Sequence, residues 1–182
     1  MNEGSSILRP REKLAFSSAL MGQTMIFNFV NLYLLIFYTD VLGVAAAAAG
    51  VLFLVARIWD AVNDPIMGIL VDKTESRWGK CRPYMLFAPV PIALLTVLLF
   101  SSPGTDAAGT IILISAAYIL WGMAYTALDI PLWTISSRMT VDSSERQSLI
   151  SMGRIFNIIG SALPVALVVP LKQALGGGDD GR

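Results

Sequence analysis

Five long apolar runs decide what this chain can fold into, because each is long enough to cross a lipid bilayer as a helix. A helix rises about 1.5 Å per residue and the hydrocarbon core is about 30 Å thick, so a crossing needs about 20 residues. The predicted spans are residues 14–38, 44–71, 84–100, 109–135 and 149–171. Charged residues make up only 14% of the chain, against about 25% in soluble domains. The sequence therefore predicts an all-α polytopic membrane protein with about five transmembrane helices.

The spans divide the chain into three parts. Residues 1–13 form a polar N-terminal tail, residues 14–171 form the transmembrane helix bundle, and residues 172–182 form a flexible polar tail. The first apolar run is longer than the hydrophobic core of a cleavable signal peptide, so we expect it to remain as a span. Pro89 and Pro91 predict a bend in the third span.

The distribution of lysine and arginine predicts the orientation. Nine of them lie on one side of the membrane, and two lie on the other side, after the fifth span. The nine are Arg9, Arg11, Lys13, Lys73, Arg77, Lys80, Arg82, Arg138 and Arg146. Positive charges accumulate in cytoplasmic loops, so we expect a multi-pass protein of the inner or plasma membrane with a cytoplasmic N-terminus. The formal net charge of zero gives no reason to expect a nucleic-acid partner.

Three charged residues lie inside the second span. Arg57, Asp60 and Asp64 are spaced i, i+3, i+7 and share one helix face, which Asn63 flanks. A charge at mid-bilayer costs at least about 2.5–3.5 kcal/mol, and such residues usually mark an ion or substrate path. Carboxylate and amide oxygens suit Na⁺, Li⁺ or H⁺. The alternative is an internal salt bridge between Arg57 and either aspartate.

The fourth span carries a second mixed face. Gly122, Thr126, Asp129 and Trp133 recur at helical spacing and combine a small residue, a hydroxyl, an acid and an aromatic ring. An aromatic ring stacks on the apolar face of a sugar while a carboxylate accepts hydrogen bonds from its hydroxyls. The alternative is that Asp129 pairs with an arginine and Trp133 belongs to the aromatic belt at the membrane interface.

Polar side chains also mark the first and fifth spans. Thr24 and Asn28 share a face of the first span, and Gln23 lies beside them. The alternative is that these polar side chains only hold neighbouring helices together. Arg154 and Asn157 share a face of the fifth span. The alternative for Arg154 is that its side chain reaches the membrane surface.

The charges inside the spans do not balance. Asp60, Asp64 and Asp129 carry three negative charges, whereas Arg57 and Arg154 carry two positive charges. One monovalent cation would complete the balance, and protonation of one aspartate would do so equally.

Four segments together resemble a transporter family: RIWDAVNDPIMG, SRWGKCRPY, WGMAYTALDIPLW and ERQSLISMGRIF. They are similar to the glycoside–pentoside–hexuronide:cation symporters of the major facilitator superfamily, and the resemblance runs from about Lys13 to Pro170. It implies the N-terminal portion of a twelve-helix fold, in which two six-helix bundles work by alternating access. It further implies transport of a sugar or glycoside together with Na⁺, Li⁺ or H⁺ and no further cofactor.

The resemblance also implies roles for individual residues. The cation ligands match Asp60, Asn63, Asp64 and Thr126, with Arg57 in the charge network. The sugar contacts on the fourth and fifth helices match Tyr125, Asp129, Trp133 and Arg154. The chain departs from the family pattern on the first helix, where Gln23 and Thr24 follow Gly22 in place of a Lys-Asp pair. Gln23 and Thr24 are therefore candidate substrate contacts, and the resemblance does not imply a galactoside as the sugar.

The predicted function is secondary active transport, sugar:cation symport, with this chain as an N-terminal fragment. Its expected partners are the sugar, the cation, the lipid bilayer and the missing C-terminal helix bundle of the same protein. The alternative is a truncated membrane fragment of such a symporter that does not transport. An enzyme is not expected, since the chain has no histidine and no plausible nucleophile–base pair. The sequence leaves open which sugar and which cation are carried.

Overall fold

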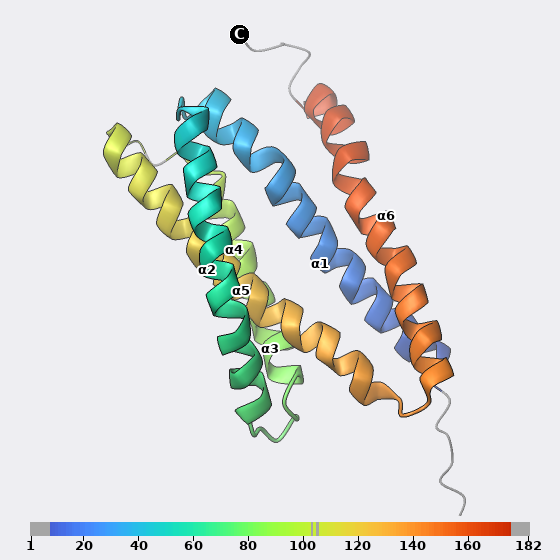
Figure 1. The fold of residues 1–182 in the computed structure, drawn as a ribbon. Coiled ribbons are helices and arrows are strands. Elements are labelled where there is room, and N and C mark those ends of the chain that lie inside the picture. Colours follow the sequence, from blue (N-terminus) through green and yellow to red (C-terminus); the bar gives the residue numbers. More distant parts are fainter. Residues whose placement is uncertain (1–7, 103, 105, 176–182) are drawn as a thin grey trace, which may run out of the picture. The chain divides into compact units, whose positions relative to one another are not determined.

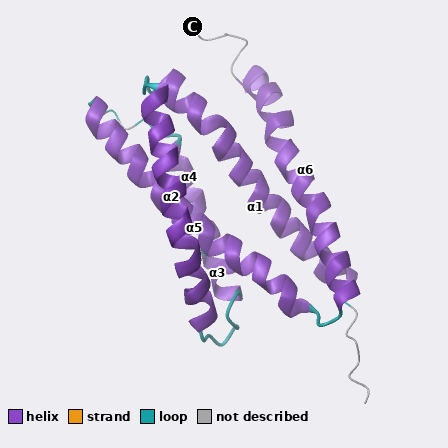
Figure 2. Ribbon diagram, in the orientation of Figure 1, coloured by secondary structure: helices purple, strands orange, loops and turns teal. Residues whose placement is uncertain are grey.

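The computed structural model describes residues 8–102, 104 and 106–175, and all regular secondary structure in them is helical (Figures 1 and 2). The elements in chain order are α1 (Pro10–Ile36), the π-helical turn η1 (Phe37–Val41), α2 (Ala46–Lys73), α3 (Arg82–Phe87), α4 (Pro89–Leu99), α5 (Ala107–Met139) and α6 (Ser143–Leu175). Residues 1–7 of the predicted N-terminal tail and residues 176–182 of the predicted C-terminal tail lie outside this description.

Among the described residues, four helices are long and apolar enough to cross a membrane. They comprise residues 10–41, 46–73, 108–139 and 143–168. Only 22–28% of their most apolar windows is buried inside the chain. Large apolar side chains such as Leu54, Ile112 and Ile158 are more than 60% exposed, as expected for helices that face lipid. The predicted helical, membrane-spanning fold is confirmed.

The third predicted span, residues 84–100, forms two shorter helices in place of one. The helix is interrupted at Ala88, directly before Pro89, because proline lacks the backbone N–H that an uninterrupted helix needs. The backbone N–H of Ala88 still donates to the carbonyl of Tyr84 at 2.9 Å. The two helices therefore follow one another, and the 18 residues from Arg82 to Leu99, Ala88 included, would extend about 27 Å in a continuous helix.

The described residues form two compact units: residues 8–31 with 136–175, and the described part of residues 32–135. In the first unit α1 and α6 lie side by side (Figure 1), and glycines of α6 allow the close approach. A Cβ atom at Gly153 would lie 2.7 Å from Leu20 Cδ1, and one at Gly160 would overlap the Met21 backbone. Lys13 Nζ and Glu145 Oε2, 2.8 Å apart, form an ion pair between the two helices.

The first turn of α6 is capped by the residue before it. One carboxylate oxygen of Asp142 accepts hydrogen bonds from the backbone N–H groups of Ser144 at 2.7 Å and Glu145 at 3.1 Å. Such a cap satisfies donors that have no partner within the helix. The same hydrogen bonds, the one from Glu145 above all, hold the pKa of the Asp142 carboxyl below its usual range.

Aromatic rings connect η1, α2 and α5 within the second unit. Tyr38 stacks on Phe53 with ring centres 6.4 Å apart, and Phe53 meets the edge of Tyr118 at 5.1 Å. Tyr118 stacks on Trp121 at 6.2 Å, and Trp121 stacks on Tyr125 at 5.2 Å. These separations are those of favourable ring pairs, and the row places α5 against α2 next to the charged face described below.

Candidate functional site

A direct hydrogen bond joins the acidic face of α2 to the polar face of α5. Thr126 Oγ1 donates to Asp64 Oδ1 at 3.1 Å. Thr126 is buried, with 6% of its surface exposed, whereas Asp64 is exposed. Two of the predicted cation ligands from segments 62 residues apart therefore lie in contact.

Asp60 lies one turn before Asp64 on α2. It packs against Gly122 of α5, which has no side chain. A Cβ atom at Gly122 would lie 3.1 Å from Asp60 Oδ1, which is tighter than an ordinary contact. On the other side, Arg57 Nη1 lies 3.5 Å from Asp60 Oδ2. The side chains of Arg57 and Asp60 are 53% and 29% exposed. The salt bridge raised as an alternative is thus present at Asp60, while Asp64 bonds to Thr126.

Asn63, the fourth predicted ligand, is 4% exposed. Its Nδ2 atom is buried and has no hydrogen-bond partner among the described residues. A buried polar group without a partner costs about 1–3 kcal/mol, so a further hydrogen-bond or ligand partner at the Asn63 amide would be favourable. Amide oxygen and nitrogen are nearly equivalent in shape, and a 180° flip presents the carbonyl oxygen at the same position.

Three predicted sugar contacts lie on α5. Trp133 Nε1 donates to Asp129 Oδ1 at 3.2 Å, and Trp133 is 39% exposed. Tyr125 stacks on Trp121 with an angle of 19° between the ring planes. Trp121 Nε1 donates to Thr96 Oγ1 of α4 at 2.9 Å, which fixes the ring on which Tyr125 rests. The acid and the aromatic ring of the predicted sugar surface are therefore paired.

The remaining predicted contacts, Gln23, Thr24 and Arg154, belong to the unit that contains α6. Gln23 and Thr24 are both buried, with 7% of their surface exposed. Asn157 Nδ2 donates to Thr24 Oγ1 at 2.6 Å across α1 and α6, and Thr24 Oγ1 lies 3.5 Å from Gln23 Oε1. Arg154 is exposed and borders a surface pocket of about 330 Å³ on α6.

Asn157 was not among the predicted site residues, although a signal for it was present. It lies three residues after Arg154, on the same face of the fifth span. Its bond to Thr24 connects positions 133 residues apart. The polar group in this unit is therefore Gln23, Thr24 and Asn157, without a charge of its own.

The ligands available in α2 and α5 are hard oxygen donors. Carboxylates, a hydroxyl and an amide suit a small monovalent cation or a proton better than zinc or copper. In the part of the chain that the structure describes, no group of three or more His, Cys, Asp or Glu side chains gathers closely enough to hold a metal ion.

Comparison with known proteins assigns the family. A family model described as MFS/sugar transport protein matches residues 15–181. The inner membrane symporter YicJ of Escherichia coli (strain K12) is 38% identical over 173 residues, which cover 95% of this chain and 38% of that protein.

Two further relatives carry substrate names. The isoprimeverose transporter of Lactiplantibacillus pentosus is 36% identical over 167 residues, covering 92% of this chain and 35% of the transporter. The putative glycoside/cation symporter YagG of Escherichia coli (strain K12) is 40% identical over 144 residues, covering 79% of this chain and 31% of that protein. The chain thus spans about a third of the length of the curated relatives it matches. Its apolar helices make it a multi-pass membrane protein, and it belongs to the family of MFS/sugar transport proteins.

Proposed function

We propose that this chain forms part of a secondary active transporter that carries a sugar or glycoside together with a monovalent cation. The relatives named as symporters, one of them for glycosides and cations, support this function. Because the chain spans about a third of their length, the proposal includes a second helix bundle that completes the alternating-access carrier. The protein is proposed to be a carrier and not an enzyme.

The hydrogen bond between Asp64 and Thr126 is the observation that carries the cation site. It brings a carboxylate and a hydroxyl of two different helices to 3.1 Å, and Asp60 lies one turn away on α2. A Na⁺ or Li⁺ ion would bind these oxygens together with the Asn63 amide oxygen, and Thr126 would turn its hydroxyl proton away. A proton on one of the two aspartates would fill the same role.

The sugar is proposed to contact Tyr125, Asp129 and Trp133 of α5. Trp133 offers an exposed ring, and its Nε1 donates to Asp129 Oδ1, so the ring and the carboxylate lie together on one helix. Gln23, Thr24 and Arg154, which belong to the other unit, are proposed as further substrate contacts in their own right. The isoprimeverose transporter among the relatives makes isoprimeverose one candidate substrate.

Cation and sugar binding are proposed to be coupled through α5. Thr126 and Asp129 lie three residues apart, so an ion that fixes Thr126 also fixes the backbone that presents Asp129. Thermodynamic linkage makes the coupling reciprocal: the cation raises the affinity for the sugar by the same factor by which the sugar raises the affinity for the cation.

The proposed location is the inner or plasma membrane with the N-terminus in the cytoplasm. The nine-to-two distribution of lysine and arginine between the two sides supports this orientation. The polar tail before α1 and the loop between α2 and α3 then lie in the cytoplasm.

Sugar binding, titrated with NaCl and LiCl at fixed pH and then with pH at fixed salt, tests this function. The panel contains glycosides, pentosides and hexuronides. Asp60→Asn should abolish the dependence on the cation, whereas Asp72→Asn, an exposed acid at the end of the same helix, should retain it. A response to Na⁺ or Li⁺ indicates a metal-ion site, and a response to pH alone indicates a proton site. Undiminished Na⁺ stimulation in Asp60→Asn would refute the assignment.

The alternative, a membrane fragment that binds without transporting, is tested by sugar uptake into vesicles that contain only this chain. Alternating access needs two bundles, so these 182 residues alone should bind and not accumulate sugar. Accumulation by these residues alone would contradict the need for a second bundle.

A further inference from the structure

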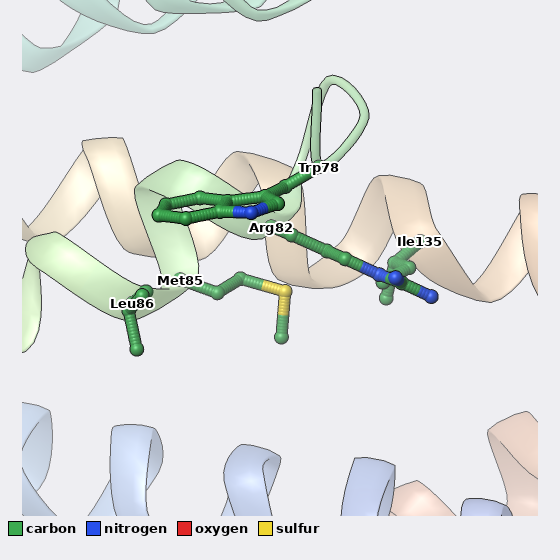
Figure 3. A pocket seen from close by; sticks show the side chains of 5 residues that line it. All are labelled: Trp78, Arg82, Met85, Leu86 and Ile135. Carbon is green, nitrogen blue, oxygen red and sulfur yellow. The ribbon is translucent and has the colours of Figure 1, made fainter. Parts of the chain in front are cut away.

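A pocket of about 460 Å³ lies outside the proposed transport sites, where the α2–α3 loop and α3 meet the later part of α5. Its lining residues are Trp78, Arg82, Met85, Leu86 and Ile135. Figure 3 shows the Trp78 ring lying over Met85, with Leu86 at one end and Arg82 extending toward Ile135 at the other. None of the five belongs to the proposed cation or sugar sites.

The lining combines one positive charge with apolar walls. Arg82 supplies a planar guanidinium, a group that can bind a phosphate through two parallel hydrogen bonds. The other lining side chains are apolar or aromatic, and Leu86 and Trp78 are 61% and 40% exposed. A free anion would gain little from these walls, whereas a ligand with a charged head and an apolar chain would contact both parts of the pocket.

A polar loop adjoins the pocket. Residues 74–81 form this loop between apolar helices, so we expect it at the membrane surface, where lipid headgroups meet acyl chains. Trp78 stacks on Phe87, with ring centres 6.2 Å apart, and Phe87 is 60% exposed. Tryptophan at this depth is typical of the membrane interface.

The charges of residues 72–82, which include the α2–α3 loop, favour an anion. Lys73, Arg77 and Lys80 accompany Arg82, against the acids Asp72 and Glu75, so residues 72–82 carry an excess of positive charge. The Arg77 guanidinium lies 4.8 Å from the centre of the Trp78 ring, and Lys80 Nζ donates to the backbone carbonyl of Asp72. Basic groups of this kind attract anionic lipid headgroups.

We propose that this pocket binds an anionic phospholipid. Arg82 contacts the phosphate, and one acyl chain lies along Met85, Leu86 and Ile135. Because these residues come from α3 and α5, the bound lipid fastens the interrupted third span to the helix that carries the proposed sugar contacts.

Quenching of tryptophan fluorescence by lipids with brominated acyl chains tests the proposal on the purified full chain in nanodiscs. The chain has four tryptophans, so the Trp78 contribution is the difference between the unaltered chain and Trp78→Phe. We expect brominated phosphatidylglycerol to quench Trp78 more than brominated phosphatidylcholine. Arg82→Gln should lower this preference about fivefold, the factor typical of one arginine at an anionic surface. Arg138→Gln, an exposed arginine near the end of α5, should leave it unchanged.

Two further measurements keep the outcome decisive. Arg82→Lys retains the charge without the paired hydrogen bonds, so its preference for the anionic lipid should fall below that of the unaltered chain. This comparison remains available if Arg82→Gln fails to fold. Inorganic phosphate at millimolar concentration should not displace the lipid. Displacement by phosphate would indicate a free-anion site, and equal quenching by both lipids would indicate no headgroup recognition. Either result would overturn the proposal.

Discussion

Replacing Thr126 by valine tests the proposed cation site with little change in shape. Thr126 is 6% exposed, and its hydroxyl donates to Asp64 Oδ1 at 3.1 Å. Valine keeps the branched side chain and substitutes a methyl group for the hydroxyl, so no large cavity forms. What is lost is one hydrogen bond to a charged group and one oxygen ligand for the cation.

The structure allows the size of the effect to be estimated. The lost contact between the ion and the Thr126 hydroxyl is comparable to a hydrogen bond to a charged group, which contributes about 1.5–3 kcal/mol, and each 1.4 kcal/mol is a factor of about ten in an equilibrium constant. The dissociation constant for the coupling cation should therefore rise about 10- to 150-fold in Thr126→Val. Thr126→Ser keeps the hydroxyl and removes only a methyl group, so its cation affinity should stay much closer to the original.

The assay is the rise in unfolding temperature of the purified protein as NaCl or LiCl is added. A cation that binds only the folded state stabilises it increasingly with concentration, and the midpoint reports the dissociation constant. Thr134→Val is the matched control, because Thr134 also lies on α5 but donates to the backbone carbonyl of Ile130 at 2.8 Å. Equal cation affinity in Thr126→Val and Thr134→Val would refute the assignment of Thr126 as a ligand.

Two further predictions concern the α6 unit. Gly160→Ala should lower the free energy of unfolding by about 1–3 kcal/mol, because its Cβ overlaps the Met21 backbone and forces α1 and α6 apart; denaturant titration in detergent measures this. Asp142→Ala should destabilise the first turn of α6 at neutral pH. The pKa of the Asp142 carboxyl is lower in the folded chain than in the unfolded chain, where it is about 4. The cap therefore stabilises the folded chain at pH values above about 4, and this stabilisation is lost as the pH falls through the folded-state pKa. Hydrogen exchange of that turn at pH 7 and pH 3 checks the sign.

The chain offers a control for each of these changes. At Gly68 of α2 an added Cβ meets nothing within 4 Å, so Gly68→Ala should be neutral or stabilising. An equal loss of stability at Gly160 and Gly68 would show that the close approach to Met21 is unimportant. For Asp142, the difference between variant and original should shrink at pH 3, and a difference that grows there would contradict the role of the ionised carboxylate.

The helices themselves could be predicted because their cause is local. An apolar run of 20 or more residues must satisfy its backbone hydrogen bonds internally in a bilayer, and a helix does so. The interruption before Pro89 is local in the same sense, since proline removes a specific N–H. The π-helical turn at Phe37–Val41 was not predicted, because its hydrogen bonds depend on how the end of α1 packs and not on apolar content.

The contacts between helices could not be derived from spacing. Periodicity indicates that Asp60 and Asp64 share a face, but the level at which α5 meets that face depends on packing along both helices. The family resemblance placed Thr126 with the aspartates, and the bond to Asp64 agrees with that grouping. The shared face with Arg154 indicates Asn157 as a polar position. Its pairing with Thr24 could not be predicted, because local sequence patterns do not show which residues 133 positions apart form a hydrogen bond.

The packing of Gly122 against Asp60 connects the fold to the proposed coupling. A larger residue at Gly122 would press on the Asp60 carboxylate, since even a Cβ atom would lie 3.1 Å away. The glycine therefore lets α5 approach α2 closely enough for Thr126, one turn later, to reach Asp64. Asp129 follows three residues after Thr126, so the same approach sets the position of the proposed sugar contact. Cation affinity and sugar affinity should consequently change together in any variant that shifts α5 against α2.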